Sequence, residues 1–456
     1  MPKRRWTRAL SEPAQLVVVA FVALILLGTG LLWLPLAADG PGHVGLEDAL
    51  FTSTSASTVT GLLSTDISRF SLFGELVILA LVQVGGFGIM TIGSVLALVA
   101  SHRVGLRQRM LAQAEIGAVD MGDLRQLIKA IAVITVAFEG TLAVILSVRL
   151  WQGGYEDGPS AVYSGVFHAI TSFNNAGISL YSDNLARFVS DPVVVLAVSG
   201  TFIVGGLGFP ILVEFWRRAR IRRADPAASR HIAWSLHTKI TLVATAVLLV
   251  FGPLAVATFE WTNSDTLGPL DTFDKLLAGW FQGVTPRTAG FNTVDIGAMN
   301  EPTLLVITTL MFIGAGPAST SGGIKVTTFA ILGFVLWSEV RGNTDANVFH
   351  RRLPANVIRQ ALTVALLSVG LVVGTSLLLM SIEDLSLTPA VFEASSAFGT
   401  VGLSTGITGA IGPTGHLVLV LMMLAGRVGP VTFVTALALR ERGRTYRYPE
   451  ERPIIG

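Results

Sequence analysis

The sequence predicts an all-α membrane protein in which four parallel repeats surround a central pore. Each repeat is a transmembrane helix, a pore helix and a second transmembrane helix, giving eight transmembrane helices and four re-entrant pore loops. The prediction rests on an apolar composition, on eight apolar segments with loops of alternating charge, and on a glycine motif that recurs four times. Of the 456 residues, 51% are hydrophobic and only 14% are charged, whereas soluble chains carry about 25% charged residues. A chain so poor in charge needs lipid as its solvent.

The composition also excludes several classes of site. The chain has no Cys, which excludes disulfides, thiolate metal sites and Cys nucleophiles. Its seven His residues form no HxxxH or HxH spacing, so a transition-metal site is not expected. With no HExxH motif and no paired Asp in an apolar segment, we expect no enzyme activity, no cofactor on this chain and no nucleic-acid partner.

The first apolar segment, residues 16–37, is too long for a secretory signal. It carries no charge over its whole length, whereas the apolar region of a signal peptide spans about 7–15 residues. We therefore interpret it as the first transmembrane helix, preceded by a basic leader that stays in the cytoplasm.

Eight apolar segments alternate with loops of opposite character. They lie at about 16–37, 76–100, 130–148, 192–213, 240–259, 302–338, 361–381 and 417–439. The loops after even-numbered segments are basic, for example SHRVGLRQR and WRRARIRRADPAASRH, and those after odd-numbered segments are acidic or neutral. The positive-inside rule then predicts a multi-pass protein of the cell membrane with both termini in the cytoplasm.

The sixth segment, Pro302–Ser338, should not be one straight helix. It would run about 55 Å, against a hydrocarbon core of about 30 Å. Its middle, IGAGPASTSGGIK (Ile313–Lys325), holds four Gly and one Pro, which should break the helix. Irregular backbone at membrane depth is tolerated only where protein buries it or where it lines a water-filled cavity. We therefore expect this segment to face a pore.

A motif centred on one glycine recurs four times, at Gly61, Gly177, Gly290 and Gly402, which are 116, 113 and 112 residues apart. An apolar residue follows each glycine, and an aromatic residue precedes it by ten positions. Clusters of small residues recur in the next apolar segment. The predicted repeats are residues 1–110, 111–225, 226–345, with an interrupted second helix at 314–323, and 346–456 with a cytoplasmic tail. Each repeat holds an even number of spans, so all four are parallel.

Four parallel loops around one axis suit the binding of a dehydrated cation, which needs oxygen ligands in place of water. Glycine allows backbone conformations that turn successive carbonyls toward the axis, and the pore helices would point their negative C-terminal ends at the ion. No carboxylate lies within the four loops, which favours a monovalent cation. The expected ligands, mainly through backbone carbonyls, are Val59, Thr60, Gly61, Asn175, Ala176, Gly177, Thr288, Ala289, Gly290, Thr400, Val401 and Gly402.

Six stretches carry a family resemblance: STVTGL, SFNNAGIS, TPRTAGFNT, SAFGTVGLST, GPASTSGGIK and GRVGP. In this order they resemble the Trk/Ktr/HKT superfamily of potassium transporters. The chain begins at the first span of repeat one, which is similar to the Ktr-type membrane subunit. The resemblance implies potassium uptake through a channel-like pore, with K⁺ as the transported ion. It further implies that a glycine in the first loop, here Gly61, accompanies potassium selectivity, where a serine admits sodium.

The resemblance also implies a homodimer with one pore per subunit, a cytosolic RCK-type nucleotide-binding regulatory subunit, and an intramembrane gating loop in the third repeat. The residues expected at this gate are Gly314, Ala315, Gly316, Pro317, Ala318, Ser319, Thr320, Ser321, Gly322, Gly323, Lys325 and Arg427. An arginine at bilayer depth costs at least about 2.5 kcal/mol, so Arg427 either holds backbone carbonyls or forms a positive barrier below the filter. We expect hydrogen bonds from Arg427 to the loop, and Lys325 at the cytoplasmic edge.

Other polar residues have structural roles as their default interpretation. Glu139 should make a buried hydrogen bond or ion pair whose partner the sequence does not name. Arg287 should point away from the filter, and His168 should pack within a pore helix. The arginines of 217–223 fit lipid headgroups or a cytosolic partner. The alternative function is an alternating-access secondary cation transporter, such as a cation symporter, but parallel repeats favour a pore.

Overall fold

The computed structural model describes residues 13–40, 42–102, 124–225, 233–343 and 345–429. The basic leader, the basic loop after residue 102 and the C-terminal tail after residue 429 were predicted from sequence and lie outside the described residues. Within them the regular secondary structure is helical, apart from one small hairpin and an isolated bridge between Ala38 and Phe70. Its strands β1 (Asn347–Val348) and β2 (Arg351–Arg352) pair antiparallel, Asn347 with Arg352 and Val348 with Arg351.

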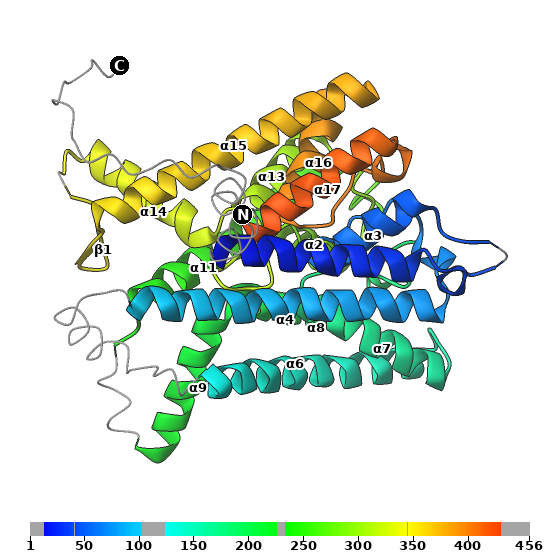
Figure 1. Ribbon diagram of the computed structural model, residues 1–456, viewed down its shortest axis with the longest axis horizontal. Coiled ribbons are helices and arrows are strands. Elements are labelled where there is room, and N and C mark those ends of the chain that lie inside the picture. Colours follow the sequence, from blue (N-terminus) through cyan, green and yellow to red (C-terminus); the bar gives the residue numbers. More distant parts are fainter. Residues whose placement is uncertain (1–12, 41, 103–123, 226–232, 344, 430–456) are drawn as a thin grey trace, which may run out of the picture.

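Helices follow one another in four groups (Figure 1). The first group is α2 (Pro13–Leu32), α3 (Leu46–Thr58) and α4 (Leu72–His102). The second is α6 (Leu124–Gln152), α7 (Gly158–Phe173), α8 (Pro192–Leu207) and α9 (Phe209–Ala224). The third is α11 (Leu236–Glu260), α12 (Thr272–Val284), α13 (Glu301–Ile313) and α14 (Val326–Val340). The fourth is α15 (Ala355–Glu383), α16 (Leu387–Gly399) and α17 (Pro413–Val428). Short 3₁₀ turns lie at Pro35–Ala37, Ile67–Arg69, Ala186–Phe188 and Thr408–Ala410.

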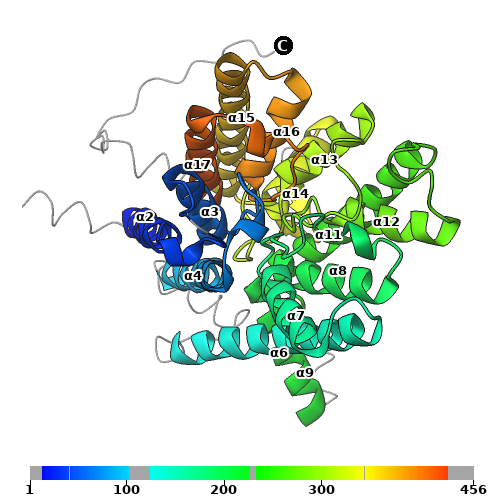
Figure 2. The same ribbon diagram turned by 90° about the vertical axis from the view of Figure 1, so that its right-hand side faces the viewer.

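The four groups close into a ring around a common centre (Figure 2). Neighbouring groups touch through α4 and α7, α8 and α12, α13 and α16, and α17 and α3. Buried apolar clusters fill these seams: Val59 and Phe167 share one cluster, and Phe51 and Phe398 share another. Because fully burying one such side chain contributes about 1.5–3 kcal/mol, this packing holds the four short helices α3, α7, α12 and α16 and their following loops together.

The helices coincide with the predicted apolar segments, but they differ in length. Among the described residues, α6 from Ile128, α11 and α15 are each long and apolar enough to cross a membrane, and the α8–α9 pair makes a fourth if it counts as one span. Shorter apolar helices lie at the remaining predicted positions. A helical, multi-pass membrane protein is therefore supported, while the full eight-span topology stays a prediction.

Two of the predicted segments are interrupted. In the sixth, α13 ends at Ile313 and α14 begins at Val326, so the helix breaks at the Gly-rich stretch as expected. In the fourth, hydropathy predicted one continuous segment, 192–213, and this prediction is wrong. Helix α8 ends at Leu207, and the axis of α9 is bent by 98° from that of α8. Gly208, with φ of 97°, makes this turn, a conformation that glycine adopts without steric cost.

Candidate functional site: a ring of four glycine loops

The four motifs share one backbone conformation. In each loop, the glycine and the residue two positions before it both have positive φ. The pairs are Val59 (55°) and Gly61 (95°), Asn175 (60°) and Gly177 (64°), Thr288 (76°) and Gly290 (76°), and Thr400 (49°) and Gly402 (94°). For a residue other than glycine this conformation costs about 1–2 kcal/mol. Its occurrence in all four loops, including at β-branched residues, indicates a conformation that the surrounding structure imposes.

The aligned glycines of neighbouring loops lie against each other in a closed circle. A Cβ on Gly177 would meet the Ala289 carbonyl oxygen at 2.7 Å, and one on Gly402 would meet the Thr60 oxygen at 2.5 Å. Likewise, a Cβ on Gly61 would collide with the Ala176 oxygen, and one on Gly290 with the Val401 oxygen. The residue before each glycine therefore directs its carbonyl oxygen at the neighbouring loop, and no side chain fits between the loops.

Side chains behind the ring hold the glycine backbone. Ser55 Oγ accepts a hydrogen bond from the Gly61 N–H at 2.9 Å, and Ser396 Oγ accepts from the Gly402 N–H at 3.2 Å. In the third loop the Thr285 hydroxyl donates to the Phe291 carbonyl at 2.6 Å. Sequence reasoning missed the two serines, although both stand six residues before their glycine. Because they are buried and satisfy N–H groups from behind, the carbonyls remain free to face the ring.

The small-residue clusters of the following helices serve packing. A Cβ on Gly85, Gly205 or Gly426 would collide with a carbonyl oxygen at the end of a short helix, that of Ser57, Phe173 or Phe398. In each case this carbonyl belongs to the residue four positions before the ring glycine. From sequence, these glycines could serve ion ligation or helix packing. Their close approach to backbone identifies them as packing positions.

The segment Gly314–Gly323, which we call the interrupting loop, lies directly beside the ring. The Thr320 hydroxyl donates to Asn175 Oδ1 at 3.0 Å, and a Cβ on Gly322 would meet Thr400 Oγ1 at 2.5 Å. On another side, the Gly316 N–H donates to the Gly206 carbonyl at 2.8 Å. The loop is therefore attached both to the ring and to the end of α8.

Two cations hold the interrupting loop from the other sides. Arg427 is only 4% exposed, and it donates to the Thr320 carbonyl, the contact expected from the sequence, and to the Gly85 carbonyl at 3.3 Å. Lys325 turns back and donates to the Ser321 carbonyl at 2.5 Å. The ammonium of Lys325 is therefore directed at carbonyls of the interrupting loop, and its expected place at the cytoplasmic edge stays a prediction.

The partners of Glu139 lie far away in sequence. Asn174 donates through Nδ2 to Glu139 Oε1 at 3.0 Å and to Gln83 Oε1 at 2.9 Å, and Gln83 donates to Glu139 Oε2 at 3.4 Å. Asn174 ends α7 immediately before the second loop. This cluster, in which Glu139 and Asn174 are buried and Gln83 is half-buried, therefore fixes the end of the short helix from behind.

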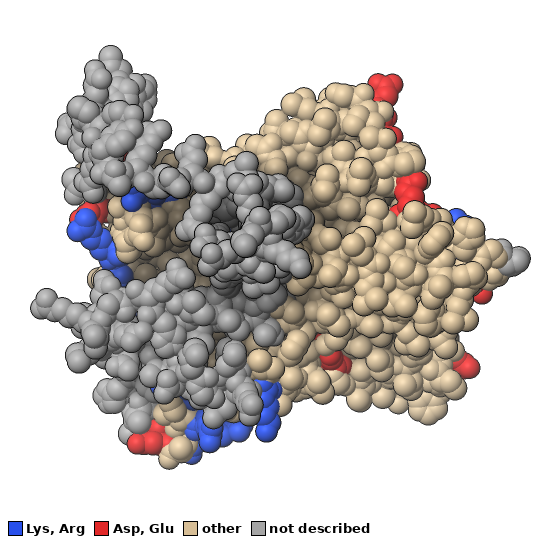
Figure 3. Space-filling model, in the orientation of Figure 1, with Lys and Arg blue, Asp and Glu red and all other residues tan. Residues whose placement is uncertain are grey.

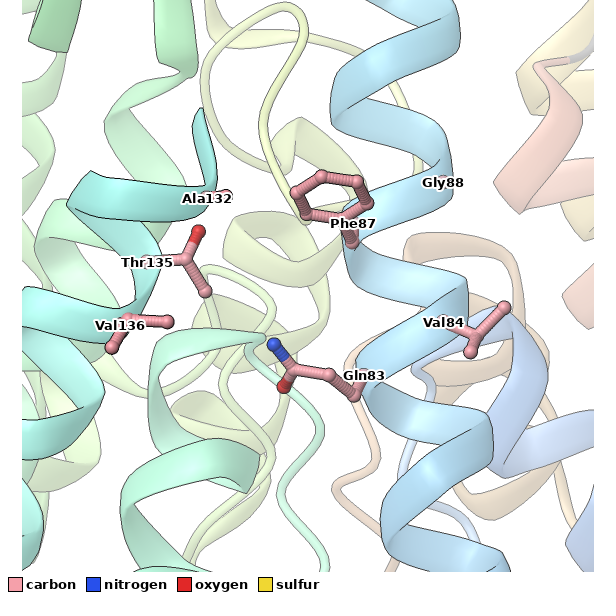
Figure 4. Close-up of a pocket in the computed structure, with 7 residues that line it drawn as sticks. All are labelled: Gln83, Val84, Phe87, Gly88, Ala132, Thr135 and Val136. Carbon is pink, nitrogen blue, oxygen red and sulfur yellow. The ribbon is translucent and has the colours of Figure 1, made fainter. Parts of the chain in front are cut away.

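An open groove of about 370 Å³ adjoins this cluster, between α4 and α6 (Figure 4). Gln83 and Phe87 of α4 and Thr135 of α6 point into it in the close-up. Its lining residues are Gln83, Val84, Phe87, Gly88, Ala132, Thr135 and Val136. The groove is mostly apolar and lies outside the ring, so it is not part of the candidate site.

The other polar residues singled out from sequence lie as expected. Arg287 is buried and donates to Thr245 Oγ1 of α11 at 3.2 Å, away from the ring. The His168 ring is hydrogen-bonded to the Ser164 carbonyl at 2.8 Å and to Ser179 Oγ at 2.9 Å, so it is a packed residue of α7. In the part of the chain that the structure describes, no three His, Asp or Glu side chains come together as a metal site.

Comparison with known proteins gives a consistent family. The family model for TrkH, a cation transport protein, matches residues 2–448. "Ktr system potassium uptake protein B" of Bacillus subtilis (strain 168) is 38% identical, covering 99% of this chain and 98% of that protein. The protein of the same name from Vibrio alginolyticus is 36% identical, covering 100% and 98%. The crystal structure of the potassium transporter TrkH from Vibrio parahaemolyticus matches with a TM-score of 0.71 at 18% identity, over 92% of this chain and 84% of that chain, which shows a shared fold.

Proposed function

The chain belongs to the TrkH family of cation transport proteins, as its motifs predicted, and from that premise we propose that it takes up potassium ions across the cell membrane through a channel-like pore. The selectivity filter is the ring of four glycine loops. The observation that carries the proposal is the repeated backbone conformation, with positive φ at the glycine and two positions before it in every loop.

The chemistry of the ring supports a monovalent cation. The carbonyl oxygens of Thr60, Ala176, Ala289 and Val401 are directed between the loops. Neutral oxygens replace the hydration shell of an ion without adding formal charge. The relatives reported above are named for potassium uptake, and K⁺ is therefore the transported ion in this proposal.

The interrupting loop acts as the gate in this proposal. It touches the ring at Asn175 and Thr400, so it stands in the path of an ion that leaves the filter. Arg427 and Lys325 hold its carbonyls and add positive charge next to that path. Release of these contacts would free the loop to move and the ion to pass.

The names of the relatives also support a proposal for the subunits with which this chain assembles. The relatives are named as protein B of a Ktr system, which fits a membrane subunit working with other subunits. We propose a homodimer, one pore in each subunit, with a cytosolic RCK-type nucleotide-binding partner on the basic side of the membrane.

Flux measurements separate this pore from the alternative, an alternating-access cation symporter. Purified protein in potassium-loaded vesicles should accumulate tracer rubidium to a level set by the membrane potential, with no requirement for a sodium or proton gradient. An alternating-access symporter would instead lose tracer accumulation when the gradient of its coupling ion is removed. Strict dependence on a sodium or proton gradient would overturn the pore.

A further inference from the structure

Helix α9 departs from the direction of the other helices. It leaves α8 at 98° and lies at the end of the molecule opposite α3 and α7 (Figure 1). If α8 runs along the membrane normal, α9 lies nearly in the plane of the membrane surface. Hydropathy alone did not predict this helix as a separate element.

One side of α9 is fixed to the start of α11. Glu214 accepts from the Ser235 N–H at 3.1 Å and from the Thr238 hydroxyl at 2.5 Å. Arg218 pairs with Glu214 at 3.5 Å, and the guanidinium of Arg218 lies 3.7 Å from the ring centroid of Trp234. These contacts set the rotation of α9 about its axis.

The exposed surface of α9 is cationic and aromatic, and we call it the arginine face. It carries four exposed arginines, Arg217, Arg220, Arg222 and Arg223. Trp216 beside them is 53% exposed, and the Arg220 guanidinium lies 5.7 Å from the centre of its ring. Glu214 is the only carboxylate within α9, and its contacts already engage it. Blue side chains gather at the lower left of the molecule, with a red group beside them, whereas the side chains at the right edge are mostly red (Figure 3).

We propose that the arginine face is a binding site for the headgroups of anionic phospholipids in the adjacent leaflet. Arginine forks match phosphate oxygens in two-pronged hydrogen bonds, and tryptophan prefers the membrane–water interface. A cationic helix lying in that interface is held by anionic lipid, with a contribution from each basic residue near the surface. The Glu214 contacts fix the rotation of the helix. Arg217, Arg220 and Arg223 lie within about 120° of one another around the helix axis, so they are presented to one lipid surface, and Arg222 lies at its flank.

Backbone contacts join the helix that carries the arginine face to the interrupting loop. At the start of α9, the Phe209 N–H donates to the Ala318 carbonyl at 3.1 Å. A Cβ on Gly208 would collide with the Pro317 oxygen. Anionic lipid that fixes α9 therefore also biases the loop. This consequence for ion flux rests on the proposed function, whereas lipid binding itself does not.

The test is lipid binding to the purified full-length chain, measured by native mass spectrometry with phosphatidylglycerol and phosphatidylcholine. Changing Arg217, Arg220, Arg222 and Arg223 together to Gln should weaken retention of phosphatidylglycerol more than tenfold and leave phosphatidylcholine unchanged. The matched control changes four exposed arginines elsewhere, Arg341, Arg351, Arg352 and Arg359, and should stay within about twofold of the parent. If the fourfold variant does not fold, the pair Arg220→Gln and Arg223→Gln serves, with a smaller loss expected.

The outcomes separate the sources of the anion. Inorganic phosphate in excess should not displace the lipid, since the lipid is held in the interface through Trp216 and several arginines at once. Equal loss in both fourfold variants, unchanged binding in the α9 variant, or displacement by phosphate would each overturn the lipid site. Rubidium flux in phosphatidylglycerol and phosphatidylcholine vesicles then tests the coupling. If lipid binding is intact but the rubidium flux is the same in both kinds of vesicle, the coupling between the lipid site and the interrupting loop is refuted and the lipid site stands.

Discussion

Gly61→Ser should weaken the preference of the pore for potassium over sodium, and the structure sets the scale of the effect. Gly61 has φ of 95°, a conformation that costs a residue with a Cβ about 1–2 kcal/mol. The new Cβ would also collide with the Ala176 carbonyl oxygen and lie 3.4 Å from the Cα of Gly402. Two loops of the ring must therefore move. If the strain of about 1–3 kcal/mol falls on the potassium-bound state, selectivity drops roughly five- to 150-fold.

The assay is tracer flux of rubidium and sodium through reconstituted protein, with protein abundance and fold verified. Gly406→Ser is the matched control, because Gly406 has nearly the same φ, 92°, but a Cβ added there would meet no atom within 4 Å. It carries similar backbone strain without the collision, so its selectivity should stay at the parental value. Parental selectivity in Gly61→Ser, or an equal loss in Gly406→Ser, would refute the role of the close approach between the loops.

Three further predictions concern the supports of the ring and the loop. Ser55→Ala leaves the buried Gly61 N–H unpaired, at about 1–3 kcal/mol, and Ser396→Ala leaves the half-buried Gly402 N–H unpaired. Selectivity should fall in both variants, and Thr at either position should restore it. Unaltered selectivity in both Ala variants would exclude a positioning role. Arg427→Ala, or deletion of several residues from 314–323, should raise rubidium flux and retain selectivity, and parental flux in both would make the loop a structural plug. Glu139→Ala should lower the melting temperature more than Glu139→Gln, which keeps one acceptor oxygen for Asn174; equal losses would show that this hydrogen bond contributes no stability.

Local patterns predicted much of the site because the chain repeats itself. Four glycines at a near-constant period identified the four loops, and the Gly-rich stretch Ile313–Lys325 predicted the break between α13 and α14. Gly314 and Gly426 each stand 24 residues after the ring glycine of their own repeat. This equal spacing predicted the hydrogen bond between Arg427, next to Gly426, and the interrupting loop. The Arg427 contact could be predicted because residue spacing along helices translates directly into depth. The role of the four loops as an ion filter stays a prediction.

Features that depend on contacts between distant segments were not predictable in this way. Val59 and Thr288 are residue types that avoid positive φ, and only the packed ring imposes it on them. Glu139 finds Gln83 and Asn174 on two other helices. The 98° turn at Gly208 escaped notice since hydropathy measures the polarity of a segment and carries no direction.

The most direct test of the ion site is a rubidium-soaked crystal of the full-length protein, measured at the rubidium absorption edge. We expect an anomalous density peak on the axis of the ring, among the carbonyl oxygens of Thr60, Ala176, Ala289 and Val401, and its loss in Gly61→Ser crystals. Rubidium bound elsewhere, with an empty ring at saturating concentration, would contradict the assignment of the ring as the ion site.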